Sequence, residues 1–135
     1  KTNKIRDTYI NCQCDNSQST PLMAAVYNGH TEWVKNLLLA KAKTSICNKN
    51  GEDVFILASQ WPQVEVLKVI LALYIANGYS IDKESPLDNL TMFMRAVITY
   101  RTKNAKYLKR KGAAVNHKNS EGNTILHIAL EKKLK

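Results

Sequence analysis

The chain has 135 residues, of which 44% are hydrophobic and 23% are charged, and its formal net charge is +9. This length and composition are typical of one folded domain with a hydrophobic core. No apolar run reaches the ~18 residues that a membrane-spanning helix requires, so the sequence predicts no transmembrane segment.

The positive charge is concentrated near the C-terminal end. Residues 1–100 hold ten Lys or Arg and nine Asp or Glu, whereas residues 101–135 hold ten Lys or Arg and only two Asp or Glu. This asymmetry favours an acidic or polyanionic partner. The alternative is a solvated helix face that keeps the protein soluble, and the sequence does not decide between the two.

Three cysteines, Cys12, Cys14 and Cys47, show no disulfide framework spacing, which favours a reducing compartment such as the cytoplasm. Cys12 and Cys14 lie too close in the chain for an easy bridge, and no second Cys or His pair completes a zinc site. Residues 1–7 are polar and do not resemble a signal peptide. Because the chain does not begin with Met, we expect a fragment of a longer chain.

One pattern recurs four times along the chain. It reads TPLMAAVYNGH from Thr20, DVFILASQWPQ from Asp53, TMFMRAVITYR from Thr91 and TILHIALEKK from Thr124. In each segment the third residue is Leu or Phe and the sixth is Ala, and the intervals are 33, 38 and 33 residues. Such a regular period predicts a repeat architecture.

An apolar helical pattern follows each of the first three segments, at residues 34–42, 65–82 and 105–116. The second pattern is longer by about four residues at 73–76, and the loop 83–90 is longer by one. Each unit is therefore predicted to be an inner helix, a tight turn, an outer helix and a loop. Because such a pair cannot bury its apolar face alone, the units are expected to stack into an all-α solenoid.

The sequence resembles the ankyrin-repeat family, whose 33-residue unit carries a T-P-L-H-x-A signature. Matches to this family's pattern occur at Thr20-Pro21-Leu22, Gly29-His30, Leu126-His127 and Ala129, and at residues 112–116, which read GAAVN. The resemblance implies an ankyrin-repeat domain over residues 15–135. Its units are about 15–47, 48–85, 86–118 and an incomplete 119–135, after a cap or the end of a preceding repeat at 1–14.

The pattern assigns architectural roles to several side chains. Thr20, Asp53 and Thr124 suit helix N-caps, and the His127 ring is placed to bond the cap of its own helix. Pro62 and Tyr100 stand where the family's turn glycine belongs. Leu22 and Leu126 are expected to point inward, and Trp33 is expected to be buried in the core.

No catalytic constellation occurs in the sequence. A Gly-rich phosphate loop, a G-x-S-x-G turn and an H-E-x-x-H helix are all absent, and the three histidines fall on separate units. The sequence therefore predicts a chain that is not an enzyme and that needs no cofactor and no metal.

Ankyrin-repeat proteins generally bind partner proteins through a concave groove lined by loop tips and inner helices, and the resemblance implies the same scaffold function here. By position, the groove residues are Tyr27, Asn28, Lys49, Asn50, Glu52, Gln60, Trp61, Ile98, Thr99, Lys118 and Glu121. Trp61 has two interpretations: an interface anchor, or a brace beside Pro62 for a turn without glycine.

Two alternative functions remain. One is polyanion binding, to nucleic acid or an anionic membrane, through the basic C-terminal quarter with Arg101, Lys103, Lys106, Lys109, Arg110 and Lys111. Nucleic acid is disfavoured because only Tyr100 and Tyr107 are near these cations. The other is a substrate-recruiting part of a larger enzyme. The composition, rich in Lys, Asn and Ile, is associated with bacterial or viral effectors, which would act in a host cytosol.

Overall fold

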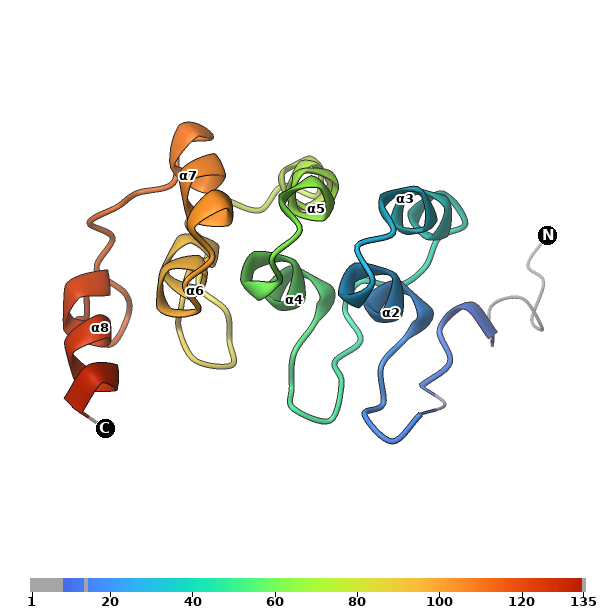
Figure 1. The fold of residues 1–135 in the computed structure, drawn as a ribbon, viewed down its shortest axis with the longest axis horizontal. Helices are drawn as coiled ribbons and strands as arrows, with labels where there is room; N and C mark the ends of the chain where they lie inside the picture. The colour runs from blue at the N-terminus through green and yellow to red at the C-terminus, as the bar shows by residue number, and fades with distance from the viewer. Residues whose placement is uncertain (1–8, 14, 135) are drawn as a thin grey trace.

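The computed structural model describes residues 9–13 and 15–134 and consists of two rows of short helices (Figure 1). The inner row is formed by α2 (Pro21–Tyr27), α4 (Val54–Gln60), α6 (Met92–Ile98) and α8 (Ile125–Leu134). The outer row is formed by α3 (Thr31–Leu39), α5 (Val64–Ala76) and α7 (Thr102–Arg110). All regular structure in the described residues is helical, which confirms the predicted all-α repeat fold. Residues 1–8 and 14 of the predicted N-terminal cap lie outside the described residues.

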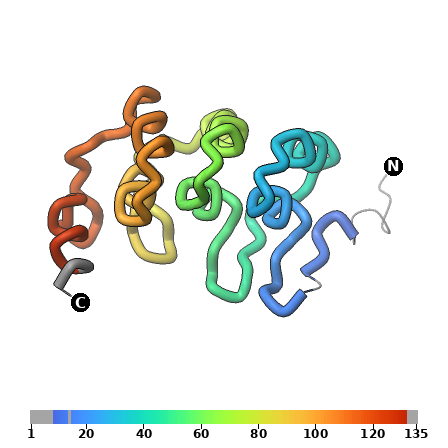
Figure 2. The backbone as a smooth tube through the Cα atoms, viewed as in Figure 1, coloured from blue at the N-terminus to red at the C-terminus, as the bar shows by residue number. Residues whose placement is uncertain are grey.

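Long loops connect each outer helix to the next inner helix. Figure 2 shows the loops at residues 42–53 and 78–91 extending from the inner row, on the side away from the outer row. The second loop (42–53) and the third loop (78–91) precede α4 and α6, and the fourth loop (112–124) precedes α8. The first loop (15–19) precedes α2.

Side-chain caps fix where the inner helices begin. The amides of Met23, Ile56 and Met94 donate hydrogen bonds of 3.3, 3.0 and 3.2 Å to the side chains of Thr20, Asp53 and Thr91. Each bond satisfies a backbone donor that has no partner within its helix. At the last inner helix, Thr124 Oγ1 lies 2.8 Å from His127 Nδ1, which confirms the predicted pair.

Two loops share one hydrogen-bonding pattern built on a buried asparagine. Asn48 Oδ1 accepts from the amides of Asn50 and Glu52, at 2.9 and 3.0 Å. In the fourth loop Asn119 Oδ1 accepts from the amides of Glu121 and Asn123, at 3.0 and 2.9 Å. The side chain thus adds to the backbone hydrogen bonds between Asn48 and Glu52 and between Asn119 and Asn123, and each loop folds into a tight turn.

The turn between inner and outer helix differs among the units. Gly29 adopts a left-handed φ of 65°, and Tyr100 adopts 61° although it carries a side chain. Left-handed backbone is unfavourable for residues other than glycine. In the second unit Trp61 has an extended backbone, with φ −91° and ψ 145°, so Pro62 can follow and no glycine is required.

Stacking of neighbouring units buries one face of every inner helix. α2 packs on α4, α4 on α6 and α6 on α8, while α3 packs on α5 and α5 on α7. Leu57 and Ile128 occupy the same repeat position and are both buried, whereas Ala24 at this position in the first described unit is exposed. This position therefore faces the preceding unit.

The expectation for Leu126 was wrong. Leu22, at the same repeat position, is 1% exposed, whereas Leu126 is 66% exposed. An outer helix of the same unit covers Leu22, but α8 packs mainly on α6 and no described outer helix follows it. The residue of α8 that enters the core is Ile128, which packs with Leu90 and Met94.

The expectation for Trp33 was also wrong, because its side chain is 61% exposed. The same position in the other outer helices, Val66 and Asn104, is buried. Asn104 donates to the carbonyl of Ser59 at 3.1 Å, so this position faces the preceding unit. No described outer-row helix precedes α3, and Trp33 therefore contacts solvent.

The cysteines differ from one another. Cys12 is disulfide-bonded, although the cysteine spacing favoured no disulfide framework, whereas Cys47 is free and exposed. Within the described parts of the chain, no helix is both long and apolar enough to cross a bilayer. No group of three or more His, Cys, Asp or Glu in those parts is arranged to hold a metal ion.

Candidate functional site

Tyr27 and Trp61, predicted as anchors for a partner, contact each other across the first two units. Their ring centroids lie 4.8 Å apart in an edge-on arrangement with an interplanar angle of 68°. The Trp61 indole Nε1 also donates a 2.7 Å hydrogen bond to the Tyr27 carbonyl. Both side chains are half-buried against the core. These contacts join the end of the first inner helix to the end of the second.

Glu52 and Gln60, also predicted groove residues, are joined in a polar network. Glu52 accepts hydrogen bonds from Asn48 Nδ2 at 3.0 Å and from Gln60 Nε2 at 2.9 Å. The Gln60 carbonyl in turn accepts a 2.7 Å bond from Arg101 Nε of the third unit. The network ties the second loop to α4 and α4 to the next turn.

The other predicted groove residues fall into two groups. Ile98 and Thr99 are half-buried, and Thr99 Oγ1 donates to the Arg95 carbonyl at 2.6 Å. The side chains that remain exposed belong to Asn28, Lys49, Asn50, Lys118 and Glu121. Burial therefore divides the predicted residues into packed side chains and exposed ones.

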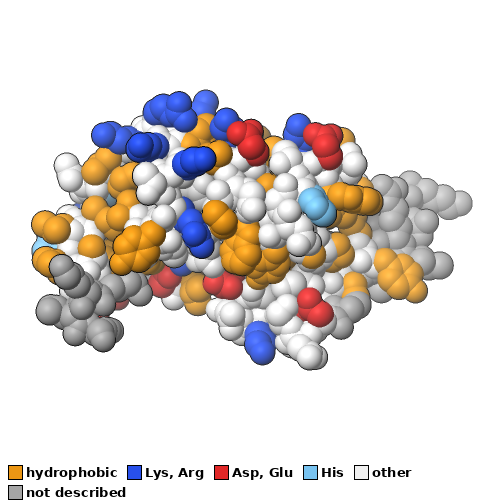
Figure 3. All heavy atoms as spheres, viewed as in Figure 1, with side chains coloured by type: hydrophobic (Ala, Val, Ile, Leu, Met, Phe, Trp, Pro, Cys, Tyr) orange, Lys and Arg blue, Asp and Glu red, His pale blue; other side chains and the backbone are white. Residues whose placement is uncertain are grey.

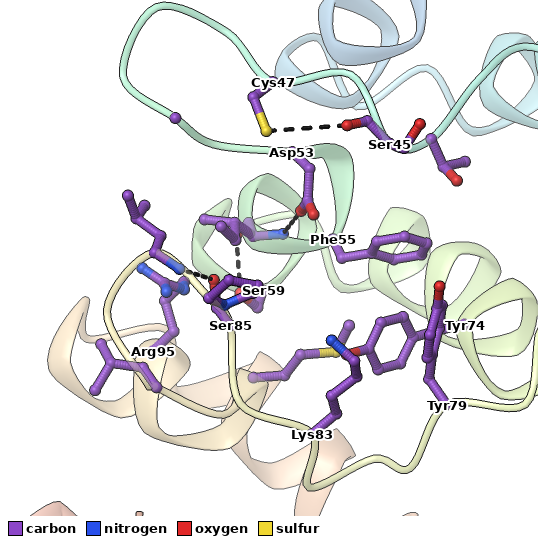
Figure 4. Close-up of a pocket in the computed structure, with 17 residues that line it drawn as sticks. Ser45, Cys47, Asp53, Phe55, Ser59, Tyr74, Tyr79, Lys83, Ser85 and Arg95 are labelled. Carbon is purple, nitrogen blue, oxygen red and sulfur yellow. Dashed lines mark hydrogen bonds between the residues drawn. The ribbon is translucent and has the colours of Figure 1, made fainter. Parts of the chain in front are cut away.

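A cavity of about 440 Å³ lies between the second and third loops (Figure 4). Its lining includes Asp53 and Phe55 from the start of α4, Tyr74 from α5, and Tyr79 and Lys83 from the third loop. A cavity of this size falls in the ~300–1,000 Å³ range of ligand pockets. We call it the loop cavity.

Three aromatic rings form a row along the loop cavity. Phe55 and Tyr74 have centroids 4.6 Å apart, and Tyr74 and Tyr79 have centroids 4.9 Å apart. Lys83 extends the row, because its Nζ lies 5.2 Å from the Tyr79 ring centroid. Tyr79 is 43% exposed, so the row passes from the core to the surface. Rings arranged in this way present a rigid apolar surface to a ligand.

Burial and nearby charges shift the pKa values of two polar groups in the loop cavity. Burial raises the pKa of Asp53 above 3.8, against the opposing hydrogen bonds and the charges of Arg95 and Lys83. Burial, with the nearby Asp53 charge and Tyr79, raises the pKa of Tyr74 to about 12. The Tyr74 hydroxyl therefore stays protonated even at alkaline pH and can act as a hydrogen-bond donor.

Arg95 supports the cavity from the side of α6. Its side chain is 8% exposed, and Nη2 lies 2.6 Å from Asp88 Oδ1 in the third loop. It occupies the repeat position that holds Leu57 and Ile128 in other units. At a position that is apolar in other units, the charged Arg95 thus holds the third loop against α6 through its ion pair with Asp88.

The aromatic row and Lys83 of the loop cavity were not among the contacts predicted from the sequence. The sequence feature that indicates the loop cavity is the additional length of the second unit, which was interpreted only as a departure from the family pattern. α5 has 13 residues where α3 and α7 have 9. The extension carries Tyr74 past the end of a normal outer helix, and the Tyr79 amide then bonds to the Tyr74 carbonyl at 3.3 Å. Extra length in one repeat therefore marked the site.

Comparison with known proteins agrees with this architecture. A family model described as "Ankyrin repeats (3 copies)" matches residues 3–77, more than half of the chain. The chain belongs to the ankyrin-repeat family. Ankyrin repeats are generally protein–protein interaction modules, and the resemblance found in the sequence is thereby confirmed at family level.

One curated relative is similar over almost the whole chain. Alpha-latrocrustotoxin-Lt1a of Latrodectus tredecimguttatus is 28% identical over 123 residues, which is 91% of this chain. The match covers only 8% of that relative. The similarity therefore concerns a short stretch of a much longer protein.

Proposed function

We propose that this chain is a non-catalytic binding module that holds a segment of a partner protein in the loop cavity. The observation that carries the proposal is the aromatic row of Phe55, Tyr74 and Tyr79 along a cavity of about 440 Å³. Aromatic side chains supply large contact areas and are enriched among the residues that dominate binding energy. Ankyrin-repeat family membership supports a protein as the ligand.

The lining of the loop cavity favours a particular partner chemistry. An apolar or aromatic side chain would pack on the exposed edge of the row at Tyr79, and a carboxylate beside it would pair with Lys83. Lys83 makes no ion pair within the described residues and contacts the Tyr79 ring instead. An acidic partner also suits a chain with a net charge of +9.

The exposed loop tips complete the proposed interface. Lys49 and Asn50 lie on the second loop, which contributes Gly51 to the cavity lining. We assign Asn28, Lys118 and Glu121 secondary contacts that set the orientation of the partner. Tyr27 and Trp61 act in this proposal by holding the first two units in register.

The proposal is tested with peptides selected from a random display library on the wild-type protein. We expect selected peptides to pair an apolar residue with a nearby acid, and Tyr79→Ala and Lys83→Ala to weaken their binding about tenfold or more, as hot-spot residues do. The matched controls are Tyr100→Ala and Lys43→Ala, which alter exposed residues outside the loop cavity. If the controls weaken binding and the cavity variants do not, the proposal is wrong.

A further inference from the structure

A second cavity lies on the outer row, between α5 and α7, and its rim is basic. It has a volume of about 640 Å³ and is lined by Val64, Lys68, Lys103, Lys106, Lys109 and Arg110. Figure 3 shows Lys and Arg side chains gathered along the upper edge of the molecule, over α7. We call this the basic pocket. It is separate from the loop cavity, since the two share no lining residue.

Most cations of the basic pocket lack an acidic partner. Among the cations that line the basic pocket, only Lys68 forms an ion pair with a described residue. Its partner is Glu65 at 3.2 Å, and both side chains remain partly exposed. Lys103, Lys106, Lys109 and Arg110 form none. An anion entering the pocket would therefore meet several donors without first displacing a protein carboxylate.

The repeats show where this imbalance arises. The second residue of α3 is Glu32, which pairs with Lys35, and the second residue of α5 is Glu65. In α7 the same position is Lys103, and the first turn contains no acid. A cation there opposes the helix dipole and repels the cation one turn later, both of which are unfavourable for the helix.

The packing of α7 does not require these cations. Its buried residues are Asn104 and Leu108, and Lys103, Lys106, Lys109 and Arg110 are all exposed. The charges nevertheless converge from two helices on one depression rather than spreading over the outer surface. The basic residues predicted from the sequence lie on α7 and at its ends. In the structure Lys68 of α5 joins them, and Val64 of α5 also lines the pocket.

We propose that the basic pocket binds a compact anion that carries several phosphate groups. A concave site of this volume suits a small polyphosphate, because clustered lysines bind phosphates as point charges that each contact a different group. A single-stranded nucleic acid would in addition need exposed rings on which its bases could stack. Tyr107, the ring beside the pocket, is instead approached by Lys68, Arg110 and Lys111 at 5.6, 5.9 and 5.6 Å from its centroid.

Calorimetric titration with inositol hexakisphosphate tests the proposal on the full chain at physiological salt. The pocket variant is the double mutant Lys106→Glu, Lys109→Glu, and the control is Lys43→Glu, Lys118→Glu, which makes the same change in net charge at exposed sites elsewhere. We expect the wild-type and control proteins to bind similarly and the pocket variant to bind at least tenfold more weakly. Circular dichroism confirms that both variants keep their helices.

The same proteins distinguish the sources of the phosphates. Flotation with vesicles containing phosphatidylinositol bisphosphate, compared with phosphatidylserine vesicles of equal charge, shows whether a lipid headgroup is bound by the same lysines. Pocket-dependent binding of the bisphosphate vesicles assigns a lipid source, and binding of the free anion alone assigns a soluble one.

Three outcomes would overturn the proposal. The first is no binding of inositol hexakisphosphate by the wild type, and the second is equal weakening by both double mutants, which would show that net charge alone attracts the anion. The third is tighter, pocket-dependent binding of a single-stranded oligonucleotide, which would make the basic pocket a nucleic-acid site.

Discussion

The indole Nε1 of Trp61 donates a 2.7 Å hydrogen bond to the carbonyl of Tyr27, and the two rings meet edge to plane at 4.8 Å. This contact joins the end of α2 to the end of α4 at a turn that has no glycine. It explains how the second unit keeps its place in the stack although its turn sequence departs from the family pattern.

Replacing Trp61 should therefore destabilise the fold. Trp61→Ala removes a half-buried ring, an aromatic pair and a hydrogen bond, and we expect a loss of about 2–3 kcal/mol in the free energy of unfolding. Urea denaturation measures this loss. The control is Trp33→Ala, which removes an exposed indole and should change stability by less than about 0.5 kcal/mol. Equal effects at both sites would contradict the bracing role.

Leu22 and Leu126 occupy the same repeat position but differ in burial. Leu22→Ala should cost about 2–5 kcal/mol, because it opens a cavity in the core. Leu126→Ala should cost less than about 1 kcal/mol, since its side chain is already exposed to solvent. Chemical denaturation of the two variants compares them directly. A large loss at Leu126 would mean that another part of the protein covers α8.

These positions show how far the sequence determined the fold. The Thr20 and Asp53 caps and the extra length of α5 follow from local chemistry that a single sequence displays. Burial of Leu126 and Trp33 depends on which unit lies on either side, so a repeat pattern that treats all units alike misplaces the terminal ones.

The candidate site was less predictable than the fold. The loop cavity arises where an extended helix and a longer loop bring Tyr74, Tyr79 and Lys83 beside Phe55. Family positions describe units of standard length and carry no information about such an insertion. Tyr27 and Trp61 are residue types that are common at interfaces, and their contact with each other is visible only in the structure.

Glu84 should make stability depend on acid pH. It accepts hydrogen bonds from His117 Nε2 at 2.9 Å and from the Ser120 hydroxyl at 2.7 Å, and these bonds lower its pKa from 4.5 to about 2. A lowered pKa stabilises the folded state above the ordinary value of 4.5, and this contribution is lost as the pH falls towards about 2.

Glu84→Gln tests this link between the third and fourth loops. We expect the variant to be less stable than wild type at pH 7, and the difference between them to shrink steadily below the ordinary Glu pKa of 4.5. Urea midpoints at a series of pH values give the comparison. A difference that stays constant down to pH ~2 would show that ionisation of Glu84 does not contribute.

Asp53 should show the opposite dependence on charge. Because burial raises the pKa of Asp53, the protonated carboxyl favours the folded state. This stabilisation is lost as the pH rises through the raised pKa. Asp53→Asn keeps the helix cap without the charge and should be at least as stable as wild type at pH 7. Asp53→Ala removes the cap and should cost about 1 kcal/mol. If the Asn variant is as unstable as the Ala variant, the charge itself is needed at this position.

The central claim is that a partner segment occupies the loop cavity, and Cys47 reports on it directly. This thiol lines the cavity, is free and exposed, and has a pKa raised by burial and by the charge of Asp53. The measurement is the rate at which maleimide alkylates Cys47, followed by peptide-level mass spectrometry, with and without a saturating library-selected peptide. Occupancy of the loop cavity predicts that the peptide slows alkylation about tenfold or more and that dilution reverses this effect. At the same peptide concentration, alkylation of Tyr79→Ala should be slowed only weakly. An unchanged rate at full saturation would contradict the claim, because the peptide would then be bound elsewhere.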